Sequence, residues 1–160
     1  MLKIKSRKNM LATEILTQDH RQAMRLVETL EGATDGTGSY AESFNQLAAA
    51  LALHMREEEE IYYPALAQHE EFEDIMDDNV AEHEMVKQML VQMNELAPSS
   101  DEFQDLLGQL KTALEAHMTD EEGDIFPESI EVLGADRIEQ LGDEIESLKA
   151  EGGIGRAMNM

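Results

Sequence analysis

A set of histidines and glutamates recurs at a fixed spacing, and this repeat constrains the fold more than any other feature of the chain. His20 is followed 34 residues later by His54 and then by Glu58. The same residue types return 63 positions further along, at His83, His117 and Glu121. A duplicated pattern is typical of a structure in which two similar units each contribute the same part. The sequence therefore predicts one site built from two similar halves.

The flanks of the repeat are also alike. The segment HMREEEEIYYP at residues 54–64 matches HMTDEEGDIFP at residues 117–127. Both place a methionine after the histidine, a second glutamate after the first, and an aromatic residue directly before a proline. Four of the five histidines of the chain belong to this pattern, so coincidence explains it poorly.

Apolar residues recur with a helical period of about 3.6, and no segment alternates as a half-buried strand does. The pattern predicts helices at 12–31, 40–68 and 72–96, and a fourth that starts at a Ser100 cap. Pro64 is expected to kink the second helix near its end. Four long helices with short connections predict an all-α, up-down-up-down four-helix bundle over residues 12–128.

The two ends of the chain are expected to lie outside this bundle. Residues 1–11 form a basic N-terminal arm with no apolar run that could serve as a signal peptide. Residues 129–160 are expected to hold a short fifth helix, at about 135–150, and a flexible Gly-rich tail with the sequence EGGIGRAMNM.

Composition excludes several classes of function. A net charge of −23 excludes nucleic acid as a partner, because binding to phosphates requires clustered Lys and Arg. No stretch approaches the roughly 20 apolar residues of a membrane span, so we expect no membrane association and a cytoplasmic protein. The chain has no cysteine, which excludes thiolate ligands and leaves histidine and carboxylate as the metal ligands available.

Each of the six repeated residues takes an apolar position on the inward face of its helix. A His and a Glu four residues apart share one face, so such a pair can satisfy itself in a core without a metal. The duplicated spacing disfavours this alternative, since it leaves the additional histidine of each half unexplained. Burying a charged carboxylate without a counterion costs roughly several kcal/mol of free energy, and a bound cation would compensate this cost. Imidazole with carboxylate suits iron, manganese or zinc, and two carboxylates indicate a pair of ions.

The motifs resemble those of the hemerythrin-like, or HHE cation-binding, proteins. The resemblance rests on QDH at 18–20, AEHE at 81–84 and the two HM segments with their IYYP and IFP ends. It implies a four-helix bundle around a non-haem di-iron centre with a bridging oxo or hydroxo group. It also implies four terminal histidine ligands and two bridging glutamates, which are His20, His54, His83, His117, Glu58 and Glu121.

Two departures from the oxygen-carrying hemerythrins bear on function. Asn79 stands where those proteins have a further histidine, and the second motif is HxxxE instead of HxxxxD. In both features the chain resembles the branch of HHE proteins that includes iron-centre repair proteins and proteins with peroxide activity. This resemblance disfavours a role in simple oxygen transport. Whether Tyr62, Tyr63 or Glu122 provides an additional ligand remains open at this point.

Other residues near the motifs are given simpler roles. Tyr62 lies four residues after Glu58 and is the tyrosine that can face the site on an α-helix, although a core position is the simpler interpretation. Glu59 and Glu122 are expected to be partners of the ligands or solvated residues. His69 has no counterpart in the repeat and is expected on the surface.

We therefore expect a di-iron protein that binds or reacts with a small ligand such as O2, NO or peroxide. Three alternatives remain open at this point. The protein could sense or bind its ligand reversibly, it could be a peroxidase-like or catalase-like enzyme, or it could handle iron or repair iron centres.

Overall fold

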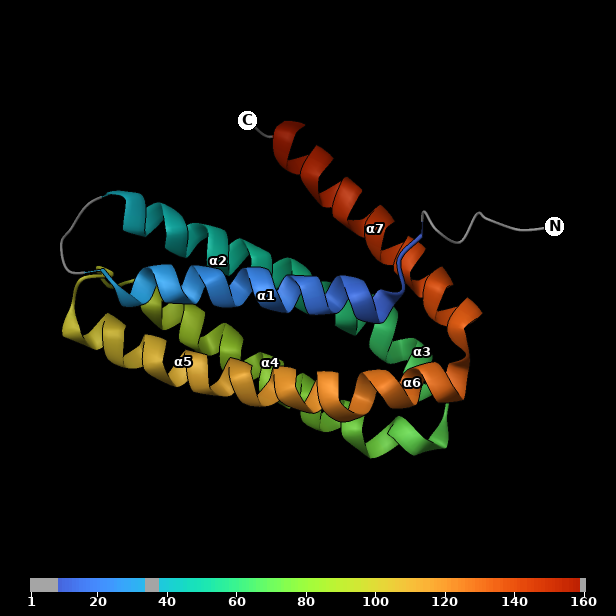
Figure 1. Cartoon of the computed structure of the whole chain (residues 1–160). Coiled ribbons are helices and arrows are strands. Elements are labelled where there is room, and N and C mark those ends of the chain that lie inside the picture. Colours follow the sequence, from blue (N-terminus) through green and yellow to red (C-terminus); the bar gives the residue numbers. More distant parts are fainter. Residues whose placement is uncertain (1–8, 34–37, 159–160) are drawn as a thin grey trace.

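The computed structural model describes the backbone of residues 9–33 and 38–158 and the side chains of residues 9–33 and 40–151. These residues are all helical apart from turns, which confirms the all-α prediction. Four long helices lie side by side and form the bundle (Figure 1). They are α1 (Ala12–Glu31), α2 (Gly38–Glu57), α4 (Glu73–Met93) and α5 (Asp101–Asp120).

Two of the long helices continue through a π-helical segment. α2 passes through η2 (Glu58–Tyr62) into α3 (Tyr63–Ala67), and α5 passes through η4 (Glu121–Ile125) into α6 (Phe126–Leu133). The N–H of Tyr63 donates to the carbonyl of Glu58, and the N–H of Phe126 donates to that of Glu121. Proline follows each segment, at Pro64 and Pro127. Its ring clashes with the carbonyl four residues earlier in an α-helix, and the wider turn relieves this clash. The predicted kink therefore takes the form of a π segment.

The helix boundaries follow local sequence signals closely. α1 has the predicted ends, and Ser100 caps α5 by accepting a hydrogen bond from the N–H of Phe103 at 3.1 Å. A short 3₁₀ turn, η3 (Glu70–Phe72), precedes α4. On α4, Val80 is apolar but 38% exposed, whereas the polar Asn79 beside it is buried. Val80 lies roughly a quarter turn from the centre of the buried face at 3.6 residues per turn.

The C-terminal helix, α7 (Ala135–Met158), is longer than predicted. It continues eight residues beyond residue 150, through the Gly-rich segment. Glycine costs about 1 kcal/mol in a helix but keeps its backbone hydrogen bonds, so glycines alone do not end one. α7 packs against α1 and α2 and buries Ile138, Leu141 and Ile145 (Figure 1).

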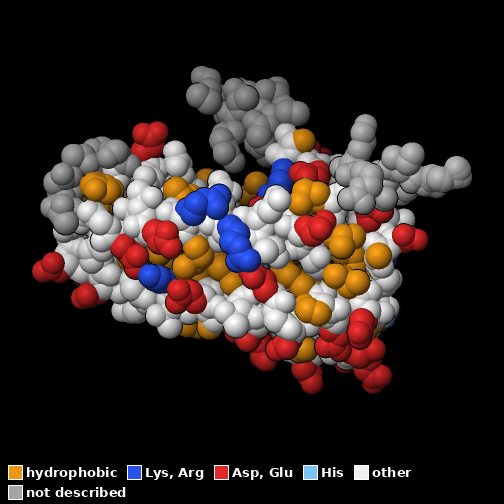
Figure 2. Space-filling model, in the orientation of Figure 1, with side chains coloured by type: hydrophobic (Ala, Val, Ile, Leu, Met, Phe, Trp, Pro, Cys, Tyr) orange, Lys and Arg blue, Asp and Glu red, His pale blue; other side chains and the backbone are white. Residues whose placement is uncertain are grey.

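A polar layer divides the apolar core into two clusters. Leu16 of α1 belongs to the cluster around Tyr62 and Phe126, whereas Ala23 belongs to the cluster around Phe103. His20 lies between them on the same helix. Acidic side chains cover the end of the bundle where η3 and α4 begin (Figure 2). No helix among the described residues is both long and apolar enough to cross a membrane.

Candidate metal centre

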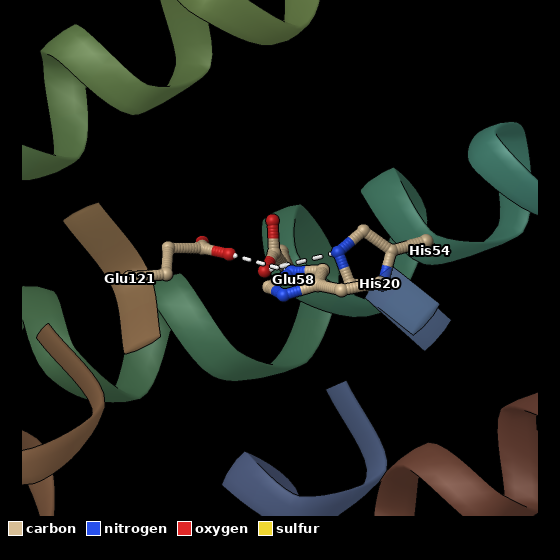
Figure 3. A group of neighbouring side chains, drawn as sticks. All are labelled: His20, His54, Glu58 and Glu121. Atoms are coloured by element: carbon tan, nitrogen blue, oxygen red, sulfur yellow. Dashed lines mark hydrogen bonds and ion pairs between the residues drawn. The ribbon is translucent and has the colours of Figure 1, made fainter. Parts of the chain in front are cut away.

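The six residues of the repeat meet in the polar layer, and all six are buried. Figure 3 shows four of them converging from three parts of the chain. α1 carries His20, α2 and η2 carry His54 and Glu58, α4 carries His83, and α5 and η4 carry His117 and Glu121. Residues separated by up to 101 positions therefore come into direct contact.

The imidazoles form two pairs, and each ring directs its Nε2 atom toward a central carboxylate. In the first pair, His20 Nε2 lies 3.1 Å from Glu121 Oε1, and His54 Nε2 lies 3.3 Å from Glu58 Oε2. In the second pair, His83 Nε2 lies 2.9 Å from Glu58 Oε1, and His117 Nε2 lies 3.3 Å from Glu121 Oε2. We call these pairs the His20–His54 half and the His83–His117 half.

Each of the two glutamates spans both halves. Glu58 directs Oε2 toward the His20–His54 half and Oε1 toward the His83–His117 half. Glu121 does the same, with Oε1 toward the first half and Oε2 toward the second. One oxygen toward each pair of imidazoles is the geometry that a carboxylate needs to bridge two ions.

Every imidazole also meets a carboxylate at its outer nitrogen, Nδ1. The four contacts measure between 2.6 and 2.9 Å and join His20 to Glu122, His54 to Asp19, His83 to Glu59 and His117 to Glu82. A carboxylate in this position orients the ring, selects the tautomer that has Nε2 free, and makes the ring a better donor. Glu59 and Glu122, which were expected to be partners or solvated residues, thus contact histidines of the repeat.

Sequence reasoning missed the other two carboxylates, Asp19 and Glu82. They are related by the same 63 positions as the six residues of the repeat, and each directly precedes a histidine of the repeat. Extending the repeat by one residue would have found them. Their true partners, His54 and His117, lie 35 residues away on a neighbouring helix.

Tyr63, and not Tyr62, is the tyrosine that faces the centre. Its hydroxyl lies 2.7 Å from Glu121 Oε2 and 2.9 Å from Glu58 Oε1, and it donates its one proton to either of them. The hydroxyl of Tyr62 instead donates to Ser129. The π segment explains this difference, because a turn closed between residues i and i+5 returns Tyr63 to the face of Glu58. Phe126 replaces Tyr63 in the other repeat, so the hydroxyl makes the centre asymmetric.

The charges of the centre are strongly coupled. Burial alone would lower the pKa of His117, but its hydrogen bonds to Glu121 and Glu58 outweigh burial and raise that pKa to about 12. Burial opposes a similar rise at His54, where the charge of Glu58 raises the pKa well above its usual value. Burial would raise the pKa of Glu58, yet the His54 charge holds it well below the usual range. In the metal-free protein, these pKa shifts favour protonated His54 and His117 beside an ionised Glu58.

The donor set fits a pair of metal ions. Among the described residues, three groups of potential ligand atoms are close enough to hold a metal; two of them consist of residues of the repeat, and these two share Glu58. His54 Nε2 and Glu58 Oε2 are fully buried without a hydrogen bond to any described residue, although they lie 3.3 Å apart. Buried polar atoms are normally paired, so these two atoms indicate that another partner belongs between them.

Three residues considered from the sequence lie outside the two ligand groups. His69 is half-buried before η3, and Glu122 contacts the outer nitrogen of His20. Asn79 is buried one turn before His83, and its Nδ2 has no hydrogen-bond partner among the described residues.

An apolar cavity adjoins the centre. It has a volume of about 270 Å³, lies between α2, α4 and α5, and reaches His54, His83 and His117. Its remaining lining is mainly aliphatic and includes Met55 and Met118, the methionines that follow two of the histidines. Both halves of the centre therefore border the same small apolar space.

Comparisons with known proteins agree with this geometry. The profile of the hemerythrin HHE cation binding domain matches residues 11–129. A crystal structure of a hemerythrin HHE cation binding domain-containing protein from Mycobacterium kansasii is 25% identical, with a TM-score of 0.72, and the match covers 94% of this chain and 91% of that one.

A DNA nickase from Nostoc sp. (strain PCC 7120) is 26% identical over 144 residues, which is 90% of this chain. The chain spans 40% of the length of that curated relative. Because the domain profile matches most of the chain, including all six residues of the repeat, the chain belongs to the hemerythrin HHE cation-binding domain family.

Proposed function

We propose that the protein holds two iron ions between its four histidines and two glutamates, and that it binds or reacts with a small ligand such as O2, NO or H2O2. The observation that carries the proposal is the orientation of Glu58 and Glu121, each of which extends one oxygen toward either half of the centre. Bound iron would supply a redox-active position for the ligand. The protein residues hold and orient the ions and exclude bulk water.

The cavity supports a small and weakly polar ligand. Its volume of about 270 Å³ is below the range of sites for drug-sized molecules, and aliphatic side chains dominate its lining. Three of the four imidazoles border it, so a ligand in the cavity would approach both metal positions. The net charge of −23 opposes contact with DNA phosphates, so the proposal does not extend to this chain the nicking activity for which the Nostoc relative is named.

A peroxide-decomposing activity, in which two H2O2 molecules yield O2 and two water molecules, is a second candidate. Asn79 favours it, because the oxygen-carrying hemerythrins have a histidine at this place and Asn79 brings no imidazole there. A centre with one histidine fewer has a position that peroxide can reach.

Metal analysis and ultraviolet-visible spectra test the proposal. Protein reconstituted with Fe2+ without oxygen should hold close to two ions per chain, and its spectrum should change on addition of O2, NO or H2O2. His54→Ala should lose metal, whereas His69→Ala, which changes a histidine outside the centre, should not. One ion or none in the wild type would refute a dinuclear centre. Oxygen release from H2O2 would favour the enzyme over reversible binding.

A further inference from the structure

α7 has no counterpart in the repeat, and it covers only one side of the centre. Apart from α6, which directly precedes it, α7 contacts mainly α1, α2 and η2, the elements that carry His20, His54 and Glu58. Figure 1 shows α7 leaving the end of α6 and passing across this side of the bundle. The environment behind the His20–His54 half is therefore different from that behind the other half.

Lys149 of α7 reaches the residues behind His54. Its Nζ lies 2.8 Å from Glu57 Oε2 and 2.9 Å from Asp19 Oδ1. The other oxygen of Asp19 accepts the hydrogen bond from His54 Nδ1 at 2.9 Å. A continuous path of short contacts thus runs from Lys149 through Asp19 to His54, whose Nε2 faces the metal position.

Among the described residues, the His83–His117 half has only a more distant and more exposed cation: Lys87 Nζ lies 3.5 Å from Glu59 Oε1 behind His83, and the Lys87 side chain is 41% exposed against 27% for Lys149. The carboxylate behind His117 has no equivalent of Lys149 among these residues. The residues 63 positions after Asp19 and Glu57 are Glu82 and Asp120. The side chain of Glu82 is 45% exposed and Asp120 is exposed, whereas Asp19 is 14% exposed and Glu57 is fully buried. Among the described residues, Glu82 has an ion pair with His117 and with no Lys or Arg. Water can solvate that carboxylate, so it does not need a cation.

Burial makes the lysine necessary on the α7 side. Asp19, Glu57 and His54 offer ligand atoms within 4.8 Å of one another, so the two carboxylates are close neighbours. Glu57, which is fully buried, and Asp19, which is 14% exposed, repel each other, and without a counterion this repulsion and burial cost roughly several kcal/mol. If the ammonium group were removed, Asp19 would turn toward water and His54 would lose the acceptor that fixes its ring.

We propose that Lys149 is a positioning residue for the His20–His54 half, and that by holding Asp19 against His54 it sets the affinity of this half for its metal ion. Docking of α7 then determines whether the second ion binds tightly. The inference rests on the proposed function, because it requires a centre with two ions. It adds an asymmetry between halves that are built from the same residue types.

Competition between the full-length protein and a chelator for Fe2+ without oxygen tests this role. Loss of a carboxylate partner behind a metal-bound histidine typically lowers metal affinity by about 10- to 100-fold. Lys149→Met should show this loss for one ion and leave the other unchanged, and Lys149→Arg should restore two tight ions. Arg137→Met is a matched control on the same helix, because Arg137 pairs with the exposed Glu144. This control should bind two ions as the wild type does.

Double variants identify the half that Lys149 serves. In a His117→Ala background the remaining ion lies in the His20–His54 half, and adding Lys149→Met should weaken it about 10- to 100-fold. In a His54→Ala background the remaining ion lies in the His83–His117 half, and adding Lys149→Met should leave its affinity unchanged. Equal losses in both backgrounds, or tighter binding without Lys149, would overturn the positioning role. Fewer than two ions in the wild type would refute the proposed function, whereas two ions with affinities insensitive to Lys149 would refute only this inference.

Discussion

Gly142 permits the close approach of α7 to the start of α1. It shares a face of α7 with Ile138, Ile145 and Lys149, which lie four residues before it and three and seven residues after it. A Cβ atom at residue 142 would overlap the carbonyl oxygen of Met10 and lie 3.0 Å from the backbone nitrogen of Ala12. Because both are backbone atoms, no side-chain rotation can relieve the overlap. Gly142→Ala must therefore move α7 away from α1.

The size of the effect follows from two opposing terms. Alanine stabilises a helix by about 1 kcal/mol relative to glycine. Forced overpacking costs about 1–3 kcal/mol. Gly108 of α5 has no atom within 4 Å of its added Cβ, so Gly108→Ala gains the first term without the second. The free energy of unfolding of Gly142→Ala should fall about 1–3 kcal/mol below that of Gly108→Ala, which is roughly 2–12 °C in Tm for a chain of this size.

Urea unfolding of the metal-free variants measures this difference, and thermal unfolding checks it. Gly142→Ala should also lower the affinity of the protein for one of the two Fe2+ ions, because Lys149 lies two turns further along the same face of α7. If both alanine variants were stabilised equally, α7 would not pack against α1 as described. If Gly142→Ala lost stability and kept two tight ions, the link between α7 docking and His54 would be refuted.

Two further predictions concern the centre itself. Tyr63→Phe should lower the free energy of unfolding of the metal-free protein by about 1.5–3 kcal/mol, because the Tyr63 hydroxyl donates to charged carboxylates. Tyr62→Phe should lower it by only about 0.5–1.5 kcal/mol, because the Tyr62 hydroxyl donates to a neutral serine. Urea unfolding measures both free energies, and equal losses would contradict the role of Tyr63. The pKa of His117 is raised from 6.5 to about 12 by its hydrogen bonds to carboxylates against the effect of burial, and that of His54 is raised as well. The stability that these groups contribute is complete below pH 6.5 and is lost as pH rises toward 12. Unfolding of metal-free protein should therefore require less urea at pH 10 than at pH 6, and a rise in stability over this range would contradict the assignment.

Local sequence signals predicted much of the helical architecture. The ends of α1, the Ser100 cap of α5 and the break before Pro64 depend on residues within a turn of each boundary, so the sequence reveals them. The six candidate ligands were also found from the sequence, because a polar residue on an apolar stripe stands out when it recurs. The length of α7 was underestimated, since glycine lowers helix propensity without removing a backbone hydrogen bond.

The sequence by itself determined which residue types enter the core and how often, because periodicity and repetition are properties of one chain. Only the tertiary structure decided which carboxylate stands behind which histidine, since these contacts cross between helices and depend on their relative positions. It also selected Tyr63 over Tyr62, because a π turn changes the face on which a residue five positions later lies. Lys149 lies 130 residues from Asp19, outside the repeat, and no local pattern connects them. Burial of Asp19 and Glu57 beneath α7 creates the need for that lysine, and burial is a property of the packed molecule.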